Sequence, residues 1–204
     1  MPLGASITAG DFSSDSNGYR QDLRTLLTND GYAVDMVGSR QSGNMEDNDN
    51  EGWSGLRIEQ IEEKAKLSVP NLQPSIFTIN AGTNDCVQNF NVDTLGSRMD
   101  ELIEYLFSTA SGSTIILSTL IINLNTDTEA RVEQANAQIT DLAAQKQADG
   151  KRIVLADMHG ADGPQPEDMA NDTHPNDVGY DKMAEIWHRA IADAISRDFV
   201  QEPL

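Results

Sequence analysis

A serine near the start of the chain and a histidine near its end are the residue types that nucleophilic catalysis requires. Ser6 lies in segment 2–10, PLGASITAG, where a short apolar strand leads into a turn bounded by glycines. His174 lies in segment 171–177, NDTHPND, a turn-forming stretch before the last amphipathic helical pattern. A serine hydroxyl becomes a nucleophile when a base lies within hydrogen-bond reach. The two segments therefore predict a nucleophile, Ser6, and a base, His174.

Both residues also have a plainer structural interpretation. In that interpretation Gly4 and Gly10 only shape a turn, and Ser6 caps the helix that follows. The chain has three histidines. His188 falls off the apolar stripe of the last helix, and His159 follows the last strand in a glycine-rich loop with no serine beside it. His174 is therefore the predicted base, and its support for Ser6 is what favours the catalytic interpretation.

A third motif, NAGTND at residues 80–85, directly follows a strongly apolar strand predicted at 75–79. An early serine, a central Gly-Thr-Asn-Asp and a late His-Pro-Asn loop are far more specific together than singly. With these motifs the sequence resembles the SGNH (GDSL-like) hydrolase superfamily, and more narrowly the acetylxylan esterases of carbohydrate esterase family three. The resemblance runs from Leu3 to about Met183 and implies a flavodoxin-like SGNH hydrolase fold.

The resemblance implies an oxyanion hole made of the Ser6 backbone N–H, a glycine N–H and an asparagine side chain. The asparagine corresponds to Asn84, whose plainer role would be to stabilise its own loop in an Asx-turn. The loop between the first strands offers several glycines. We choose Gly55, which lies immediately before the next helix, as the donor, and Gly38 is the second choice.

Two positions depart from the family pattern. The usual Gly-Asp-Ser reads Gly4-Ala5-Ser6, and the usual carboxylate three residues before the histidine is Asn171. An asparagine can accept a hydrogen bond from the imidazole, but it cannot offset the charge of an imidazolium. Asp172 is adjacent and is the alternative orienting residue. The hypothesis that follows from this departure is a slow enzyme, or one that relies mainly on a Ser-His pair.

The loops around the predicted site are polar, which favours a small acyl group on a polar alcohol over a lipid chain. Trp53 is the main large apolar residue nearby and is a candidate to stack on a sugar ring, or else to fill its own loop. The resemblance implies acetyl esters of xylan-type polysaccharide as substrate, secretion, and no cofactor. A monomer is expected.

Two rival functions remain open on the sequence alone. One is a flavodoxin-like domain in which Ser6 and Thr8 cradle the phosphate of a nucleotide. The absence of a Gly-Lys-Ser/Thr motif weighs against it. The other is a catalytically weak, carbohydrate-binding relative, which Asn171 makes conceivable.

The composition of the chain limits the kinds of molecule that it is expected to bind. Against 33 acidic residues the chain has 14 lysines and arginines, a net charge of −19, which repels nucleic acid and anionic membranes. The single cysteine, Cys86, excludes an intrachain disulfide. Segment 47–52, DNDNEG, resembles half of a calcium loop, but Ile58 stands where the bidentate glutamate should be. We therefore expect a solvated acidic loop and no metal.

The hydrophobic pattern predicts one α/β domain over residues 1–204, with a doubly wound, parallel sheet of about five strands and helices on both faces. Apolar stripes predict helices at 19–30, 58–70, 95–108, 128–149 and 178–195. Short apolar runs predict strands at the N-terminus and at 32–37, 75–79, 114–120 and 153–156, with a long polar loop at 38–52.

Overall fold

A computed structural model describes residues 1–200 of the chain. Its centre is a six-stranded sheet with the order β2-β3-β1-β4-β5-β6. Five of these strands run parallel, and β2 is an antiparallel addition at one edge. The strands are β1 (Pro2–Gly4), β2 (Arg40–Gln41), β3 (Asp49–Gly52), β4 (Ile76–Asn80), β5 (Thr114–Ser118) and β6 (Ile153–Ala156).

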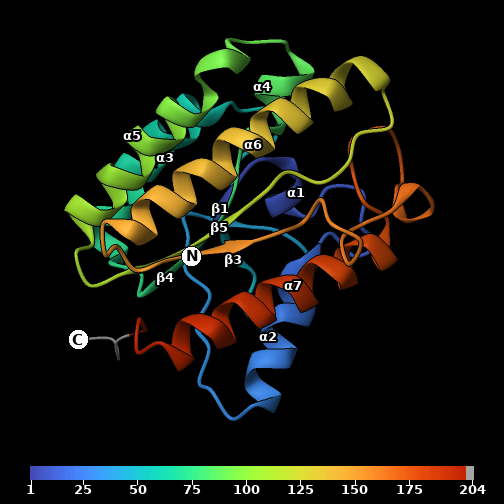
Figure 1. Ribbon diagram of the computed structural model, residues 1–204. Coiled ribbons are helices and arrows are strands. Elements are labelled where there is room, and N and C mark those ends of the chain that lie inside the picture. The colour runs from blue at the N-terminus through green and yellow to red at the C-terminus, as the bar shows by residue number, and fades with distance from the viewer. Residues whose placement is uncertain (201–204) are drawn as a thin grey trace.

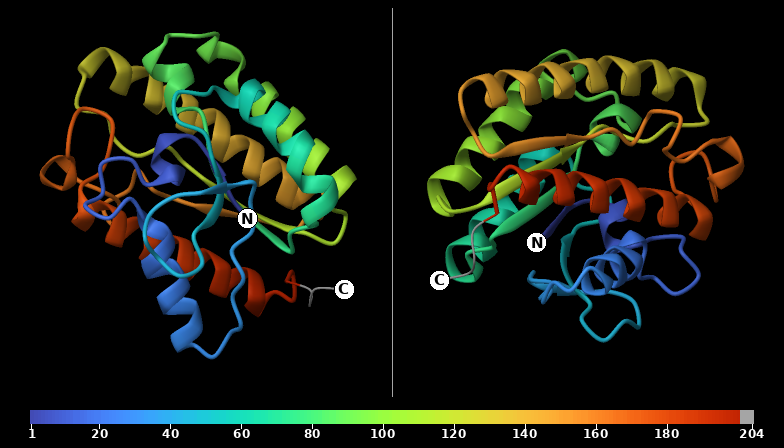
Figure 2. Two further views of the ribbon diagram at one scale, coloured as in Figure 1. Left: turned by 180° about the vertical axis from the view of Figure 1, so that it is seen from behind. Right: turned by 60° about the horizontal axis from the view of Figure 1, so that its bottom comes forward.

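Helices cover both faces of the sheet (Figure 1). One face carries α3 (Ile58–Leu72), α5 (Leu95–Thr109) and α6 (Thr126–Ala148), and the other carries α2 (Tyr19–Asn29) and α7 (Asp177–Ser196), as the left view of Figure 2 shows. Two short helices, α1 (Ser6–Ala9) and α4 (Thr83–Val87), follow β1 and β4 directly, and single 3₁₀ turns lie at Val92–Thr94 and Pro166–Asp168. The predicted doubly wound α/β architecture is confirmed.

Strand β5 shows why the two layers form. All of its residues are buried. Ile115 and Leu117 point into the core under α3, α5 and α6, whereas Ile116 points into the core under α2 and α7. Because side chains alternate across a strand, a run that is apolar throughout must be covered on both faces.

The predicted strand at residues 32–37 is wrong, because residues 32–38 form no regular structure. The strand that pairs with β1 is instead β3, inside the predicted polar loop, with Leu3 opposite Glu51. Asn50 and Glu51 are fully buried there, and the Glu51 carboxylate accepts hydrogen bonds from the Ser39 N–H and hydroxyl and from the Trp53 indole. Buried polar side chains satisfied in this way leave no hydrophobic pattern to detect.

The other predicted elements agree with the structure to within about two residues at their ends, which is ordinary for helix boundaries. Helix α3 continues through Pro70 to Leu72, beyond its predicted end. The acidic side chains of segment 47–52 bond to protein groups: Asp47 pairs with Arg24 at 3.1 Å, and Asp49 accepts from Gln41. Among residues 1–200 no helix combines the length and apolarity needed to cross a membrane.

Candidate active site

The site lies where the carboxyl ends of three neighbouring strands meet. Gly4, the last residue of β1, is in register with Gly52 of β3 and Asn80 of β4. The loops after these strands therefore start side by side, which is where open α/β sheets bind ligands. Ser6 follows β1 as the first residue of α1.

Two glycines allow the backbone segments at this edge of the sheet to approach one another closely. A Cβ atom at Gly4 would lie 2.2 Å from the carbonyl oxygen of Asn80, and one at Gly52 would lie 2.4 Å from the backbone nitrogen of Ala9. Neither separation is sterically possible, so only glycine allows α1 to settle on the end of the sheet. The position of Ser6 is thus set by backbone contacts.

Ser6 and His174 meet although 168 positions separate them in the chain. His174 Nε2 lies 2.9 Å from Ser6 Oγ. The histidine stands on a loop closed by an antiparallel bridge between Met169 and Pro175, and the Ala170 N–H donates to the His174 carbonyl at 2.8 Å. These backbone contacts fix the conformation of the loop, and the loop directs the imidazole toward α1.

Asn171 is the residue that orients the imidazole. Its Oδ1 accepts three hydrogen bonds, from the backbone N–H groups of Thr173 and His174 at 2.9 Å each and from His174 Nδ1 at 3.1 Å. Two of these donors are backbone N–H groups, so the atom facing them must be the amide oxygen. Nδ1 then carries the imidazole proton, and Nε2 is left as the acceptor that faces the serine hydroxyl.

Asp172, the alternative orienting residue, is not brought to the imidazole. Its side chain is exposed, and its carbonyl accepts a hydrogen bond from the Leu124 N–H at 2.8 Å. Within the described chain the Asp172 carboxylate makes no bond to His174. The structure therefore places Asn171, and not Asp172, against the ring.

Two residues that the sequence analysis did not single out also act on His174. The Phe12 ring stacks on the imidazole with ring centroids 4.6 Å apart. Burial lowers the pKa of His174, and the negative charge of Asp11 opposes that effect. A low pKa keeps the imidazole neutral, the state in which it can accept a proton.

The candidate oxyanion donors lie on the loops after β1, β3 and β4. The Ser6 N–H is at the first position of α1, where no intrahelical acceptor exists. Gly55 has a φ of 82°, a left-handed conformation that favours glycine. The Asn84 amide donates to the Leu56 carbonyl at 3.0 Å, so it bridges to the Gly55 turn instead of forming an Asx-turn of its own.

The second-choice glycine has another function. A Cβ atom at Gly38 would lie 2.1 Å from the carbonyl carbon and oxygen of Asn50. Gly38 thus allows the chain to pass closely over β3, and its position explains its residue type without an oxyanion.

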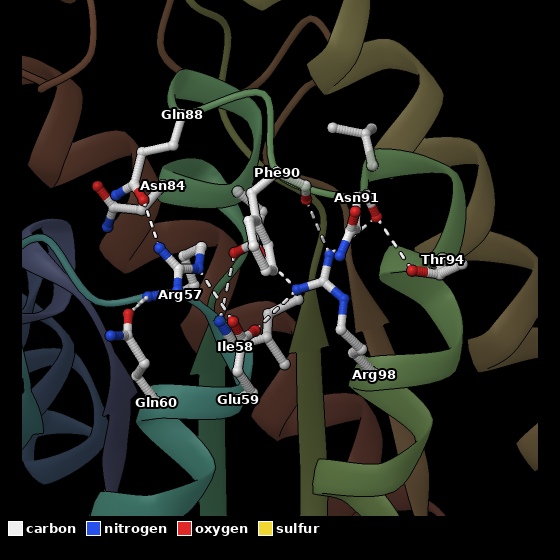
Figure 3. A network of polar contacts seen from close by, with 12 residues as sticks. Arg57, Ile58, Glu59, Gln60, Asn84, Gln88, Phe90, Asn91, Thr94 and Arg98 are labelled. Atoms are coloured by element: carbon white, nitrogen blue, oxygen red, sulfur yellow. Dashed lines mark hydrogen bonds and ion pairs between the residues drawn. The ribbon is translucent and has the colours of Figure 1, made fainter.

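A polar network joins the Gly55 and Asn84 loops (Figure 3). The Gln88 amide donates to the Gly55 carbonyl at 3.2 Å, and Arg57 donates to Gln88 at 2.7 Å. Deeper in the network, buried Asp85 is paired with Arg98 and accepts from the Ile58 N–H at 3.2 Å. Burial raises the pKa of Asp85 even though these donors stabilise its charge. The network fixes the spacing of the two candidate donors.

Trp53, the predicted sugar-stacking residue, is held by the protein's own side chains. Its indole N–H donates to Glu51 at 2.8 Å. The Arg40 guanidinium and the Lys64 ammonium lie 4.5 and 4.3 Å from the ring centroid. These contacts fill the loop around Trp53, and its contact with a sugar stays a prediction.

Comparison with known proteins places this geometry in a family. The sequence matches the GDSL-like lipase/acylhydrolase family over residues 3–182. It is 29% identical to a multidomain esterase of Ruminococcus flavefaciens over 92% of this chain, and the match spans only 27% of that protein.

Two solved structures are similar over nearly their full length. A family 3 carbohydrate esterase of Clostridium thermocellum shares 28% identity with a TM-score of 0.86, over 98% of each chain. A family 3 carbohydrate esterase of Talaromyces cellulolyticus has a TM-score of 0.83 at 23% identity, over 97% of each chain, and supports the fold. With the family match covering most of the sequence, the chain belongs to the GDSL-like lipase/acylhydrolase family.

Proposed function

We propose that this chain is a serine esterase that hydrolyses small acyl esters of carbohydrate, with acetylated xylan as the substrate. The observation that carries the proposal is the single line of hydrogen bonds from Ser6 Oγ through His174 to Asn171 Oδ1, with separations of 2.9 and 3.1 Å. This is the arrangement of nucleophile, base and orienting group that acyl transfer requires.

In the proposed reaction, each of these groups takes part in acylation of the serine or in the hydrolysis that follows. His174 Nε2 accepts the Ser6 hydroxyl proton as Oγ attacks the ester carbonyl carbon. The resulting oxyanion receives hydrogen bonds from the Ser6 and Gly55 N–H groups and from Asn84. His174 then returns the proton to the departing sugar oxygen, which leaves an acyl-serine. Water then attacks the acyl carbon as His174 takes one of its protons, and His174 returns that proton to Ser6 Oγ as the bond between the acyl carbon and Oγ breaks, which releases the carboxylic acid and restores the serine hydroxyl.

The neutral side chain of Asn171 determines the turnover rate that we expect. Asn171 fixes the imidazole tautomer through three hydrogen bonds but offers no charge to the imidazolium formed in each step. The proposal therefore includes slower turnover than the same site would have with a carboxylate at this position.

The choice of substrate rests on the relatives and on the loops. Both similar structures are named as carbohydrate esterases. Ser54, Gly55 and Phe12 are exposed beside the site, which supports the approach of an ester carried on a large hydrophilic polymer. A polysaccharide substrate outside the cell makes secretion part of the same proposal, with a monomer as the working form.

Acetate release from acetylated xylan, with 4-nitrophenyl acetate as a reference ester, tests the proposal. Ser6→Ala and His174→Ala should abolish activity on both substrates. Two matched controls should retain wild-type rates. Ser14→Ala changes an exposed serine, and His188→Ala changes a histidine that contacts Asp30.

The rivals predict different results. A phosphate-binding domain would hydrolyse neither ester, and a catalytically weak relative would bind xylan without releasing acetate. Hydrolysis of the reference ester alone would keep the esterase and reject the xylan substrate.

A further inference from the structure

Phe12 is exposed next to the proposed nucleophile in a backbone conformation that phenylalanine rarely adopts. The residue is 60% exposed, so burial of the ring does not explain its presence. Its φ is 69°, in the left-handed region that favours glycine. Residues kept in such conformations concentrate at functional sites.

The preceding residue holds Phe12 in place. The Asp11 N–H donates to the Ser6 carbonyl at 3.0 Å, and the Tyr180 hydroxyl donates to the Asp11 carbonyl at 2.6 Å. The Ser54 hydroxyl also donates to the Asp11 carboxylate at 2.8 Å. These bonds tie Asp11 to α1, to α7 and to the loop after β3, so the Phe12 ring starts from a rigid anchor.

The ring covers one face of the His174 imidazole. Their centroids are 4.6 Å apart and their planes are inclined by 28°, a stacked arrangement. A cation within about 6 Å of an aromatic face is stabilised by the ring quadrupole. The imidazole becomes such a cation each time it takes the Ser6 proton.

The site needs that stabilisation because Asn171 is uncharged. Charged groups near the histidine loop include Asp11 on the loop after α1, Asp172 on the histidine loop itself and Asp177 at the start of α7. Asp168, just before the loop, is paired with Lys182 of α7. Asp172 is exposed, and Asp177 accepts from the Ser14 N–H at 2.8 Å. Asp11 is the one whose charge acts on the imidazole.

We propose that Phe12 is a positioning residue that stabilises the His174 imidazolium by stacking, and so replaces part of what a triad carboxylate would supply. This inference rests on the proposed function, in which His174 is the base. Loss of the ring should weaken the base, whereas loss of a merely structural residue should leave its basicity unchanged.

The kinetic test is the pH dependence of 4-nitrophenyl acetate hydrolysis. Phe12→Leu keeps an apolar side chain and removes the aromatic face. It should lower kcat by about 3- to 10-fold, the range of a cation–π contact at a partly exposed site, and leave KM unchanged. The acid limb of the profile should move to lower pH, because a weaker base stays neutral to lower pH.

Two variants control this experiment. Phe12→Trp retains an aromatic face and should restore both kcat and the acid limb. Tyr32→Leu removes an exposed aromatic ring beyond the C-terminal end of α2 and should change neither. An unmoved acid limb in Phe12→Leu, or a rise in KM with kcat unchanged, would overturn the proposal and assign Phe12 to packing or to substrate contact.

A measurement without turnover separates this inference from the proposed function. Proton NMR can follow the titration of the His174 imidazole in the wild type, Phe12→Leu and Phe12→Trp, with His159 and His188 as internal references. The pKa of His174 should fall in Phe12→Leu alone, and an unchanged titration would refute the stacking effect. If Ser6→Ala remained active, the esterase mechanism would fail while the NMR titration still decided the effect of Phe12.

Discussion

Replacing Asn171 by aspartate tests how the site handles the charge of its base. The Asn171→Asp side chain has the same shape, and its oxygen would keep the donors that Asn171 Oδ1 has now: the Thr173 and His174 N–H groups and His174 Nδ1. A carboxylate with several N–H donors has a low pKa, so it would be ionised at neutral pH. The substitution therefore adds one negative charge about 3 Å from the imidazole without disturbing its orientation.

The expected gain follows from the change in that one hydrogen bond. A neutral hydrogen bond contributes about 0.5–1.5 kcal/mol, and one to a charged group about 1.5–3 kcal/mol. The difference of roughly 1–1.5 kcal/mol corresponds to a rate increase of about tenfold. The correct tautomer is already fixed in the wild type, so the much larger losses seen when a triad carboxylate is replaced and the tautomer changes do not apply.

The assay is kcat for 4-nitrophenyl acetate across pH. Asn171→Asp should raise kcat and move the acid limb to higher pH, because a carboxylate stabilises the protonated imidazole and raises the pKa of His174. Asp172→Asn, which changes an exposed neighbour, should have little effect on either. Equal kcat and an unmoved acid limb in Asn171→Asp would refute the orienting contact and return the assignment to Asp172 or to a backbone carbonyl.

Three further predictions concern the oxyanion donors, the network behind them and a carboxylate pair between α2 and α7. Asn84→Ala should lower kcat by about 10²–10³-fold with the fold intact by circular dichroism, and unchanged kcat would remove Asn84 from the oxyanion hole. Arg98→Met leaves buried Asp85 without its cation and should lower the free energy of unfolding in urea by about 3–5 kcal/mol, whereas a loss below 1 kcal/mol would contradict the pairing. Burial and the neighbouring Asp181 raise the pKa of Asp22 to about 6, from 3.8. Stability that protonated Asp22 contributes is therefore lost as pH rises through about 6, so Asp22→Asn should raise the melting temperature at pH 8 more than at pH 4.5, and equal shifts would contradict the linkage.

The layers of the fold can be predicted from local hydrophobic patterns in the sequence. The apolar residues of β5 and the stripes of α5 and α7 predict a parallel sheet covered on both faces, because each element must bury its apolar side. The hydrophobic pattern does not reveal strand β3, because Asn50 and Glu51 are buried through polar contacts with Gly52, Ser39 and Trp53. A pattern based on hydrophobicity has no signal for such a strand.

The candidate site shows the same division. Ser6, His174 and Asn84 stand in motifs whose order along the chain is informative, and these positions could be named from the sequence. The choice between Asn171 and Asp172 depended on which side chain turns toward the imidazole, a matter of loop geometry. The Phe12 stack depends on a positive φ and on bonds between Asp11 and distant residues, and only the single phenylalanine after Gly-Asp hinted at it.

Covalent labelling of the nucleophile tests the central claim most directly. Diethyl 4-nitrophenyl phosphate should transfer its diethylphosphoryl group to Ser6 Oγ with release of 4-nitrophenolate, and peptide mass spectrometry should find the label on the peptide that holds Ser6. Labelling should be far slower in His174→Ala, because Nε2 is the group that lies 2.9 Å from that hydroxyl and takes its proton. A label on a different serine, or equally fast labelling of Ser6 without His174, would contradict the proposed pair of nucleophile and base.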